Sequence, residues 1–253
     1  MYNEYDYIIL GSSTGLTTIN TIQIDSLIKT KGVNLSMDDT AMSTQYLMLQ
    51  HFLVEGHTTK LCIISPSNSA YNTLHTKLNT NDYRFLSHID RPYVYDYYEQ
   101  FNDSESKILS VSKWLPFVGV GYYNAELFYP SLLSAIKPIR KNKFDEYGNY
   151  TYPNNTNAKN FITQKVNMDI NFSNPYLNKI LKLCNDNNIK LIYYISPMKD
   201  KSVKIKETYN SIINHSNVLK TSNLFYDNIH VTKQGREKCS SFLAKELKAM
   251  LNN

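Results

Sequence analysis

The chain has 253 residues, of which 42% are hydrophobic and 19% are charged, and its formal net charge is +5. This length accommodates one α/β domain with a large insertion, and the composition is that of a globular rather than a disordered protein. Because the charge is mild and no arginine-rich run or zinc-finger spacing accompanies it, nucleic-acid binding is not expected. The 21 tyrosines are interpreted as the mark of an AT-rich genome, and the alternative is a dedicated aromatic binding surface.

Strand-like and helix-like segments alternate at the start of the chain. Residues 5–10 (YDYIIL) form a short apolar run that stops at a Gly-Ser-Ser turn, which predicts a buried parallel strand. An amphipathic helix is expected over 19–29, followed by a short second strand over 33–35. Residues 44–54 have apolar positions at helical spacing, and residues 61–65 (LCIIS) predict a third strand.

The same alternation returns near the C-terminus. Residues 175–187 predict a helix, residues 190–195 (KLIYYI) a fourth strand, and a last helix is expected from Thr232 to Leu251. Strands that alternate with helices predict an α/β fold with a central parallel sheet and helices on both faces. Ligands of such sheets bind at the carboxyl ends of the strands, so the residues after each strand are the candidates for function.

Residues 71–173 do not follow this alternation. The stretch is aromatic and polar, with the sequence WLPF at 114–117 and an Asn-rich tract at 154–160. We expect one domain over residues 1–253, in which 71–173 is an insertion that acts as a lid or shapes the substrate site. The insertion contains the densest basic patch of the chain, which is interpreted as a solvated face or as a contact for an anionic substrate; it comprises Lys137, Arg140, Lys141 and Lys143.

Other features of the sequence predict absences. The three cysteines are far apart and form no CxxC pair, so neither a disulfide framework nor a structural zinc is expected, and Cys62 and Cys184 are predicted to be buried thiols. No histidine has a ligand-like neighbour, and the sequence GSSTG is neither a Rossmann nor a P-loop motif, so we expect no metal and no cofactor. The short apolar run at the N-terminus is neither a signal peptide nor a membrane span, which predicts a cytoplasmic protein unless an upstream segment has been removed.

Two segments carry the residue types of a serine-nucleophile triad. Ser13 follows the first strand at the start of a helix, where unpaired N–H groups favour a developing oxyanion. Near the C-terminus, Asp227 and His230 stand three residues apart, just before the final helix. A serine nucleophile needs a general base, and the imidazole needs an acceptor that fixes its tautomer. Taken separately, each segment also fits an ordinary turn or a surface histidine beside an aspartate.

Together these segments resemble the Gly-Asp-Ser block that opens, and the Asp-x-x-His block that closes, sequences of the SGNH (GDSL-like) hydrolase family. Ser12 takes the place of the family's aspartate and is the alternative nucleophile. The resemblance covers roughly residues 5–70 and 176–250. It implies a flavodoxin-like, three-layer α/β/α fold, and a catalytic triad of Ser13, His230 and Asp227.

The resemblance also implies the donors that would stabilise an oxyanion. Besides Ser13, Asn68 falls where the family has Gly-x-Asn-Asp and would supply a side-chain amide, although Pro-Ser-Asn is also ordinary turn sequence. After the second strand, Asp39 stands, within a residue or two, at the position of the glycine whose backbone N–H serves as donor. An acidic side chain there would oppose the oxyanion unless it is turned away.

The sequence looks closest to a branch of the family that modifies bacterial surface polysaccharides. That likeness implies a serine esterase or O-acyltransferase that acts on an acyl ester of a carbohydrate. The acyl group that we expect is acetyl. Its partners would be the acylated carbohydrate or another small ester, and an acyl donor; hydrolysis and transfer both stay open. The alternative is a catalytically inactive member of the fold that serves as a binding or assembly module in glycan biosynthesis.

Overall fold

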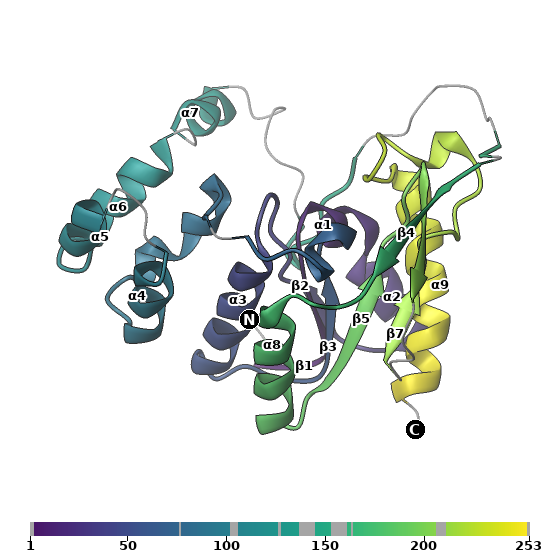
Figure 1. Cartoon of the computed structure of the whole chain (residues 1–253), viewed down its shortest axis with the longest axis horizontal. Coiled ribbons are helices and arrows are strands. Elements are labelled where there is room, and N and C mark those ends of the chain that lie inside the picture. The colour runs from purple at the N-terminus through teal and green to yellow at the C-terminus, as the bar shows by residue number, and fades with distance from the viewer. Residues whose placement is uncertain are drawn as a thin grey trace.

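A parallel sheet runs through the middle of the protein, and helices cover both of its faces (Figure 1). The computed structural model describes residues 3–75, 77–101, 106–125, 128–136, 145–152, 161–162, 164–205 and 211–251. The basic patch that begins at Lys137 and the Asn-rich tract at 154–160 lie outside the described residues.

The sheet has five strands in the order β2-β1-β3-β5-β7, and all neighbouring pairs are parallel. Its strands are β1 (Glu4–Gly11), β2 (Gly32–Asn34), β3 (Thr58–Ser65), β5 (Lys190–Ile195) and β7 (Ile212–Asn214). Numbered within the sheet alone, this order is 2-1-3-4-5, which is one of the two common doubly wound orders. The sequence predicts the first four strands, whereas β7 is too short to show a periodic pattern.

Side chains of the central strands alternate between two apolar cores, one on each face of the sheet. On one face, Ile8 and Leu10 pack with α3 (Met42–Val54) and α8 (Pro175–Asp186). On the other face, Tyr7 and Ile9 pack with α2 (Thr21–Ile28) and α9 (Lys233–Leu251). The two cores give the three-layer α/β/α arrangement that the alternation predicts. The prediction that Cys62 and Cys184 are buried thiols is confirmed, because Cys62 lies on β3 and Cys184 on α8, within the first core.

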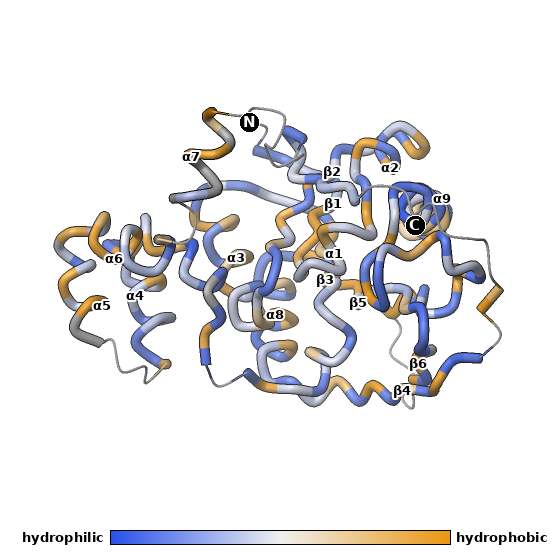
Figure 2. The backbone as a smooth tube through the Cα atoms, turned by 90° about the horizontal axis from the view of Figure 1, so that it is seen from above, coloured by the Kyte–Doolittle hydropathy of each residue, from blue (hydrophilic) through white to orange (hydrophobic). Residues whose placement is uncertain are grey.

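A group of helices follows β3 and stands beside α3, away from the sheet (Figures 1 and 2). It comprises the 3-10 helix Thr80–His88 and the helices α4 (Pro92–Glu99), α5 (Ser106–Ser112), α6 (Pro116–Tyr123) and α7 (Phe128–Ile136). A third apolar cluster, rich in tyrosine, joins the 3-10 helix, α4, α5 and α6 to Leu47 of α3. Several large apolar side chains in this group of helices are exposed, among them Trp114 (82%) and Phe117 (69%).

The chain then returns to the sheet between residues 145 and 152. The buried Asn149 accepts a hydrogen bond from the Thr21 N–H (2.9 Å), and the Tyr147 carbonyl accepts one from the Asn34 N–H (3.0 Å). These contacts attach the returning segment to α2 and β2. Beyond it, β4 (Val166–Ile170) and β6 (Lys201–Ile205) pair in parallel as a small second sheet.

Candidate active site

The first loop at the carboxyl end of the sheet holds Ser13. This serine is half-buried and begins α1 (Ser13–Thr18), directly after β1. A side chain at Gly11 would overlap the Ser65 carbonyl, and a Cβ at Gly15 would lie only 2.7 Å from the same oxygen. The two glycines therefore let β1 and α1 lie against the end of β3, which fixes the position of Ser13.

A cavity of about 280 Å³ opens beside Ser13. This volume lies near the lower end of the range for small-molecule sites. Its walls combine apolar, hydroxyl, aromatic and charged side chains from α1, from the loop after β2 and from the inserted residues. They are Ser13, Leu16, Thr17, Ser36, Met37, Asp38, Arg84, Tyr150 and Tyr152.

Asp227 and His230 form a hydrogen-bonded pair in the loop before α9. The Asp227 Oδ2 lies 2.7 Å from the His230 Nδ1, and its Oδ1 accepts hydrogen bonds from the backbone N–H of Ile229 and of His230, both at 2.8 Å. Partial burial opposes ionisation of Asp227, but these hydrogen bonds outweigh it and lower the pKa of the carboxyl below its ordinary value. Asp227 is therefore an ionised acceptor that fixes the orientation of the imidazole.

The second ring nitrogen of His230 is unpaired among the described residues. Nε2 is buried and has no hydrogen-bond partner among the described residues, although the side chain as a whole is 15% exposed. The Tyr152 ring lies 5.4 Å from the His230 ring, centroid to centroid, and stacks on Tyr226 at 4.5 Å. Since Tyr152 also lines the cavity of Ser13, one aromatic side chain lies beside both the serine's cavity and the histidine.

Tyr152 thus links the cavity of Ser13 to the Asp227–His230 pair, and of the hydrogen bonds that a triad requires only the one within that pair is present. The Asp227–His230 bond is present, whereas no hydrogen bond joins the Ser13 Oγ to the His230 Nε2. Hydrogen bonds of catalytic groups are often long or unformed before substrate binds. Ser12, the alternative nucleophile, is buried, and its hydroxyl lies 3.2 Å from that of Thr14.

The two other predicted oxyanion donors have different surroundings. Asn68 is buried, its amide N–H donates to the Ser196 carbonyl (2.9 Å), and its amide oxygen accepts from the Ser196 N–H (3.2 Å). This amide connects the loops after β3 and β5, which is a structural use that the sequence does not predict. Asp39 is exposed and has a φ of 47°, in the left-handed region that favours glycine. The backbone there is glycine-like although the residue is not.

The sequence does not identify Arg84, Tyr150 and Tyr152 as site residues. All three come from residues 71–173, which carry no recognisable motif. The sequence feature that could have indicated the two tyrosines is the high tyrosine content of the chain. That content has two explanations, an AT-rich genome and an aromatic binding surface. A turn delivers them to the rim: the Asp145 Oδ1 accepts from the N–H groups of Tyr147 and Asn149, both at 3.0 Å.

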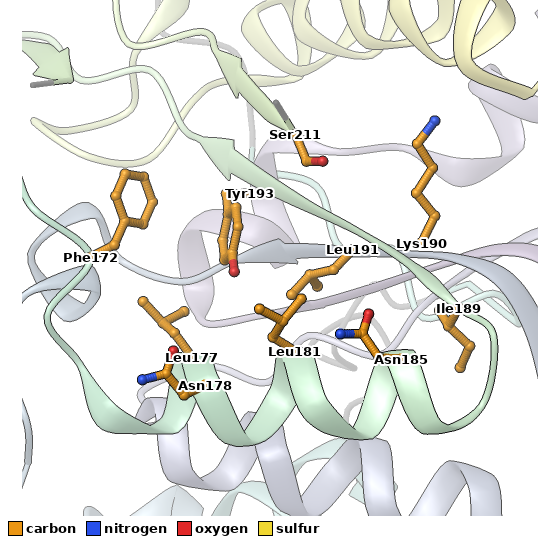
Figure 3. A pocket seen from close by; sticks show the side chains of 10 residues that line it. All are labelled: Phe172, Leu177, Asn178, Leu181, Asn185, Ile189, Lys190, Leu191, Tyr193 and Ser211. Atoms are coloured by element: carbon orange, nitrogen blue, oxygen red, sulfur yellow. The ribbon is translucent and has the colours of Figure 1, made fainter. Parts of the chain in front are cut away.

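A second cavity lies between α8 and β5 (Figure 3). Leu177 and Leu181 of α8 face Leu191 and Tyr193 of β5 across it. It contains no histidine, and Lys190 at its far end is the first residue of β5, so the cavity extends along the strand away from the carboxyl rim. The cavity beside Ser13 is therefore the better candidate for a reaction.

The described residues contain no candidate metal site and no candidate membrane span. Across the described ranges, no three His, Cys, Asp or Glu side chains are grouped closely enough to hold a metal ion. No helix in the described part of the chain has the length and apolar character needed to cross a membrane. No protein-family model matches the sequence, and no curated protein matches it significantly.

Proposed function

We propose that this protein is an SGNH-type serine esterase or O-acyltransferase that acts on an acyl, preferably acetyl, ester of a carbohydrate. The observation that carries the proposal is the buried, unpartnered Nε2 of His230, in a ring that Asp227 orients and that lies 5.4 Å from the ring of Tyr152, a wall of the cavity of Ser13. A buried imidazole nitrogen without a partner is costly, because burial removes its hydrogen bond to water. A substrate-bound state in which Ser13 donates to Nε2 would recover that hydrogen bond.

In the proposed reaction the Ser13 Oγ attacks the ester carbonyl carbon while the His230 Nε2 takes the hydroxyl proton. The C–O bond to the alcohol then breaks, and the imidazolium returns the proton to the departing oxygen. Asp227 keeps the Nδ1–H in place and stabilises the positive charge that develops on the ring. Attack of water on the acyl-enzyme gives an esterase, and attack of a sugar hydroxyl gives an acyltransferase.

The oxyanion would be stabilised by backbone N–H groups of Ser13 and of the loop that ends at Asp39. The left-handed conformation of Asp39 supports this assignment, because glycine is the residue that favours this backbone region and is the residue expected here. Asn68 fits the role less well, since its amide oxygen and one amide N–H already pair with Ser196. In this proposal Asn68 holds the rim together, and its second N–H is the only part of the amide left for the oxyanion.

Assignment to the SGNH type rests on where the sequence motifs fall in the sheet. Ser13 follows the first strand, and Asp227 and His230 precede the last helix, as the motifs of that family do. The strand order places Ser13 between β1 and β3, where the order of strands reverses and where such sheets bind ligands. A role in bacterial surface-polysaccharide biosynthesis is part of the same proposal and follows from the likeness in sequence.

A fluorophosphonate probe, which reacts with activated serines, tests the proposal. We expect the native protein to be labelled, the Ser13→Ala and His230→Ala variants to lose labelling, and all three to unfold within about 2 °C of one another, because neither side chain belongs to an apolar core. Ser69→Ala is the matched control, since Ser69 is an exposed serine that follows β3 at the same end of the sheet and does not line the cavity.

Three outcomes would contradict parts of this proposal. Labelling that persists in Ser13→Ala and disappears in Ser12→Ala would move the nucleophile to Ser12. A large fall in the melting temperature of His230→Ala would make His230 a structural residue. A native protein that is folded but not labelled would favour the non-catalytic binding module.

A further inference from the structure

Arg84 is a charged wall of the Ser13 cavity that the proposed reaction does not use. It lies in the 3-10 helix Thr80–His88, and its Nε and Nη2 both donate to the Asn81 Oδ1, at 3.2 and 2.8 Å. These two bonds tie one side of the guanidinium of the exposed Arg84 to the side chain of Asn81. Arg84 forms no ion pair with any carboxylate in the described part of the chain, and its Nη1 has no protein partner there. A guanidinium that faces a cavity without a protein counter-ion is a site for an anion of the ligand.

The remaining walls suit a carbohydrate. Tyr150 and Tyr152 present aromatic side chains, which cover the apolar faces of sugar rings, and Thr17 and Ser36 present hydroxyl groups. The Ser36 Oγ is buried without a hydrogen-bond partner among the described residues, so it is free to bond to a ligand hydroxyl. Asp38 is the only acidic residue of this wall set, and it forms no ion pair with Arg84.

We propose that Arg84 binds the carboxylate or phosphate of an anionic sugar whose acyl ester lies at Ser13. The inference rests on the proposed function, which it deepens by naming the substrate class. Ser13, at the end of the sheet, would react with the ester. Arg84, in the insertion, would select substrates that carry a negative charge. A carboxylate and a phosphate each present two oxygens that can accept a bidentate pair of hydrogen bonds from a guanidinium, so the experiment must separate these two sources of negative charge.

The test measures binding in a protein that cannot react. Calorimetry on the Ser13→Ala variant compares glucuronate and glucose 6-phosphate with glucose, which has the same ring without the charge. We expect at least one anion to bind on the order of tenfold more tightly than glucose, as one charge-assisted contact allows. Adding Arg84→Gln should remove this preference. Adding Arg91→Gln should leave it intact, because Arg91 also lies in the insertion but pairs with Glu55 outside the cavity.

The anion that binds more tightly identifies the source of the charge, and Asp38→Asn should tighten its binding by removing a like charge from the cavity. A second measurement connects the anion to Ser13: the same sugar should slow fluorophosphonate labelling of the native protein, and not that of Arg84→Gln. The inference is overturned if neither anion binds more tightly than glucose, or if the preference survives Arg84→Gln.

The two proposals can fail separately. Anion binding that depends on Arg84, in a protein whose Ser13 is never labelled, would keep the anion site and reject the esterase. Labelling of Ser13 without any preference for an anion would keep the esterase and reject the role of Arg84.

Discussion

The sheet and the inserted helices are stabilised by different chemistry. In the sheet, aliphatic side chains of β1, β3 and β5 alternate between two cores, and most of them are completely buried. In the insertion, the Tyr83 ring stacks on Tyr98 and Tyr123, with centroids 5.7 and 3.8 Å away, and a buried carboxylate, Asp82, accepts hydrogen bonds at the junction with α3. Strand periodicity determines the first region, whereas individual polar and aromatic contacts determine the second.

The candidate site divides along the same boundary. Ser13 and the Asp227–His230 pair come from loops of the sheet, while Arg84, Tyr150 and Tyr152 come from the inserted residues. Catalytic groups need a rigid support, and the ends of packed strands supply one. Substrate recognition tolerates a less regular support, so the insertion is where specificity is expected to change.

The two regions are expected to differ most in the change of stability when a glycine is replaced by alanine. A methyl group at Gly11 would overlap the Ser65 carbonyl, so Gly11→Ala should destabilise the protein by about 3 kcal/mol and displace Ser13. Gly121 lies within α6 with no atom near its Cβ position, so Gly121→Ala should stabilise by about 0.5–1 kcal/mol. Urea unfolding of both variants measures these changes. Similar changes in the free energy of unfolding at the two positions would mean that the two regions tolerate an added methyl group equally well.

The fold of the sheet could be predicted because its sequence pattern is local. Residues 5–10 and 190–195 are apolar runs of strand length that end at turn residues, and the structure forms β1 and β5 there. The helices of the insertion could not be predicted, because they depend on partners distant in sequence, such as Leu47 for the tyrosine cluster. The strand β7 was too short to be detected against its surroundings.

The candidate site was predictable only where a short motif carries the chemistry. The three-residue spacing of Asp227 and His230 predicts their contact, because the turn between them is local. Nothing in the sequence shows that Asn68 pairs with Ser196, since that bond joins residues 128 positions apart. Arg84 was equally hidden, because its place beside Ser13 depends on how the insertion folds back onto α3.

A second variant tests whether one carboxylate anchors the insertion. The Asp82 side chain accepts hydrogen bonds from the Ala41 N–H, the Asn79 N–H and the Thr44 hydroxyl, and all of it is buried. Asp82→Ala would leave the two backbone N–H donors unpaired, whereas the Thr44 hydroxyl would keep its hydrogen bond with the Tyr97 hydroxyl (2.8 Å); we expect a net cost of about 2 kcal/mol after the desolvation of the charge is removed. Asp96→Ala is the control, because Asp96 is exposed on α4. Equal melting temperatures for the two variants would show that Asp82 is not an anchor.

The same residue gives a smaller, pH-dependent effect. Burial raises the pKa of Asp82, although hydrogen bonds from Thr44, Asn79 and Ala41 act in the opposite direction. The folded state therefore binds the Asp82 proton more readily than the unfolded state does. As the pH falls from neutral towards about 4, the native protein should gain stability relative to Asp82→Asn, which cannot titrate. Thermal unfolding of both proteins across this range measures the difference, and parallel curves would contradict the shift.

The smallest effect is expected on the outer surface of the insertion. Trp114 is 82% exposed and belongs to none of the apolar clusters, so Trp114→Gln should change the free energy of unfolding by no more than about 0.5 kcal/mol. Thermal unfolding at two protein concentrations is the measurement. A loss above about 1 kcal/mol that grows with concentration would mean that another copy covers this side in solution. The insertion would then be stabilised partly by association with another copy, whereas the sheet is stabilised by its own two cores. The two regions would then differ more in their source of stability than the single chain indicates.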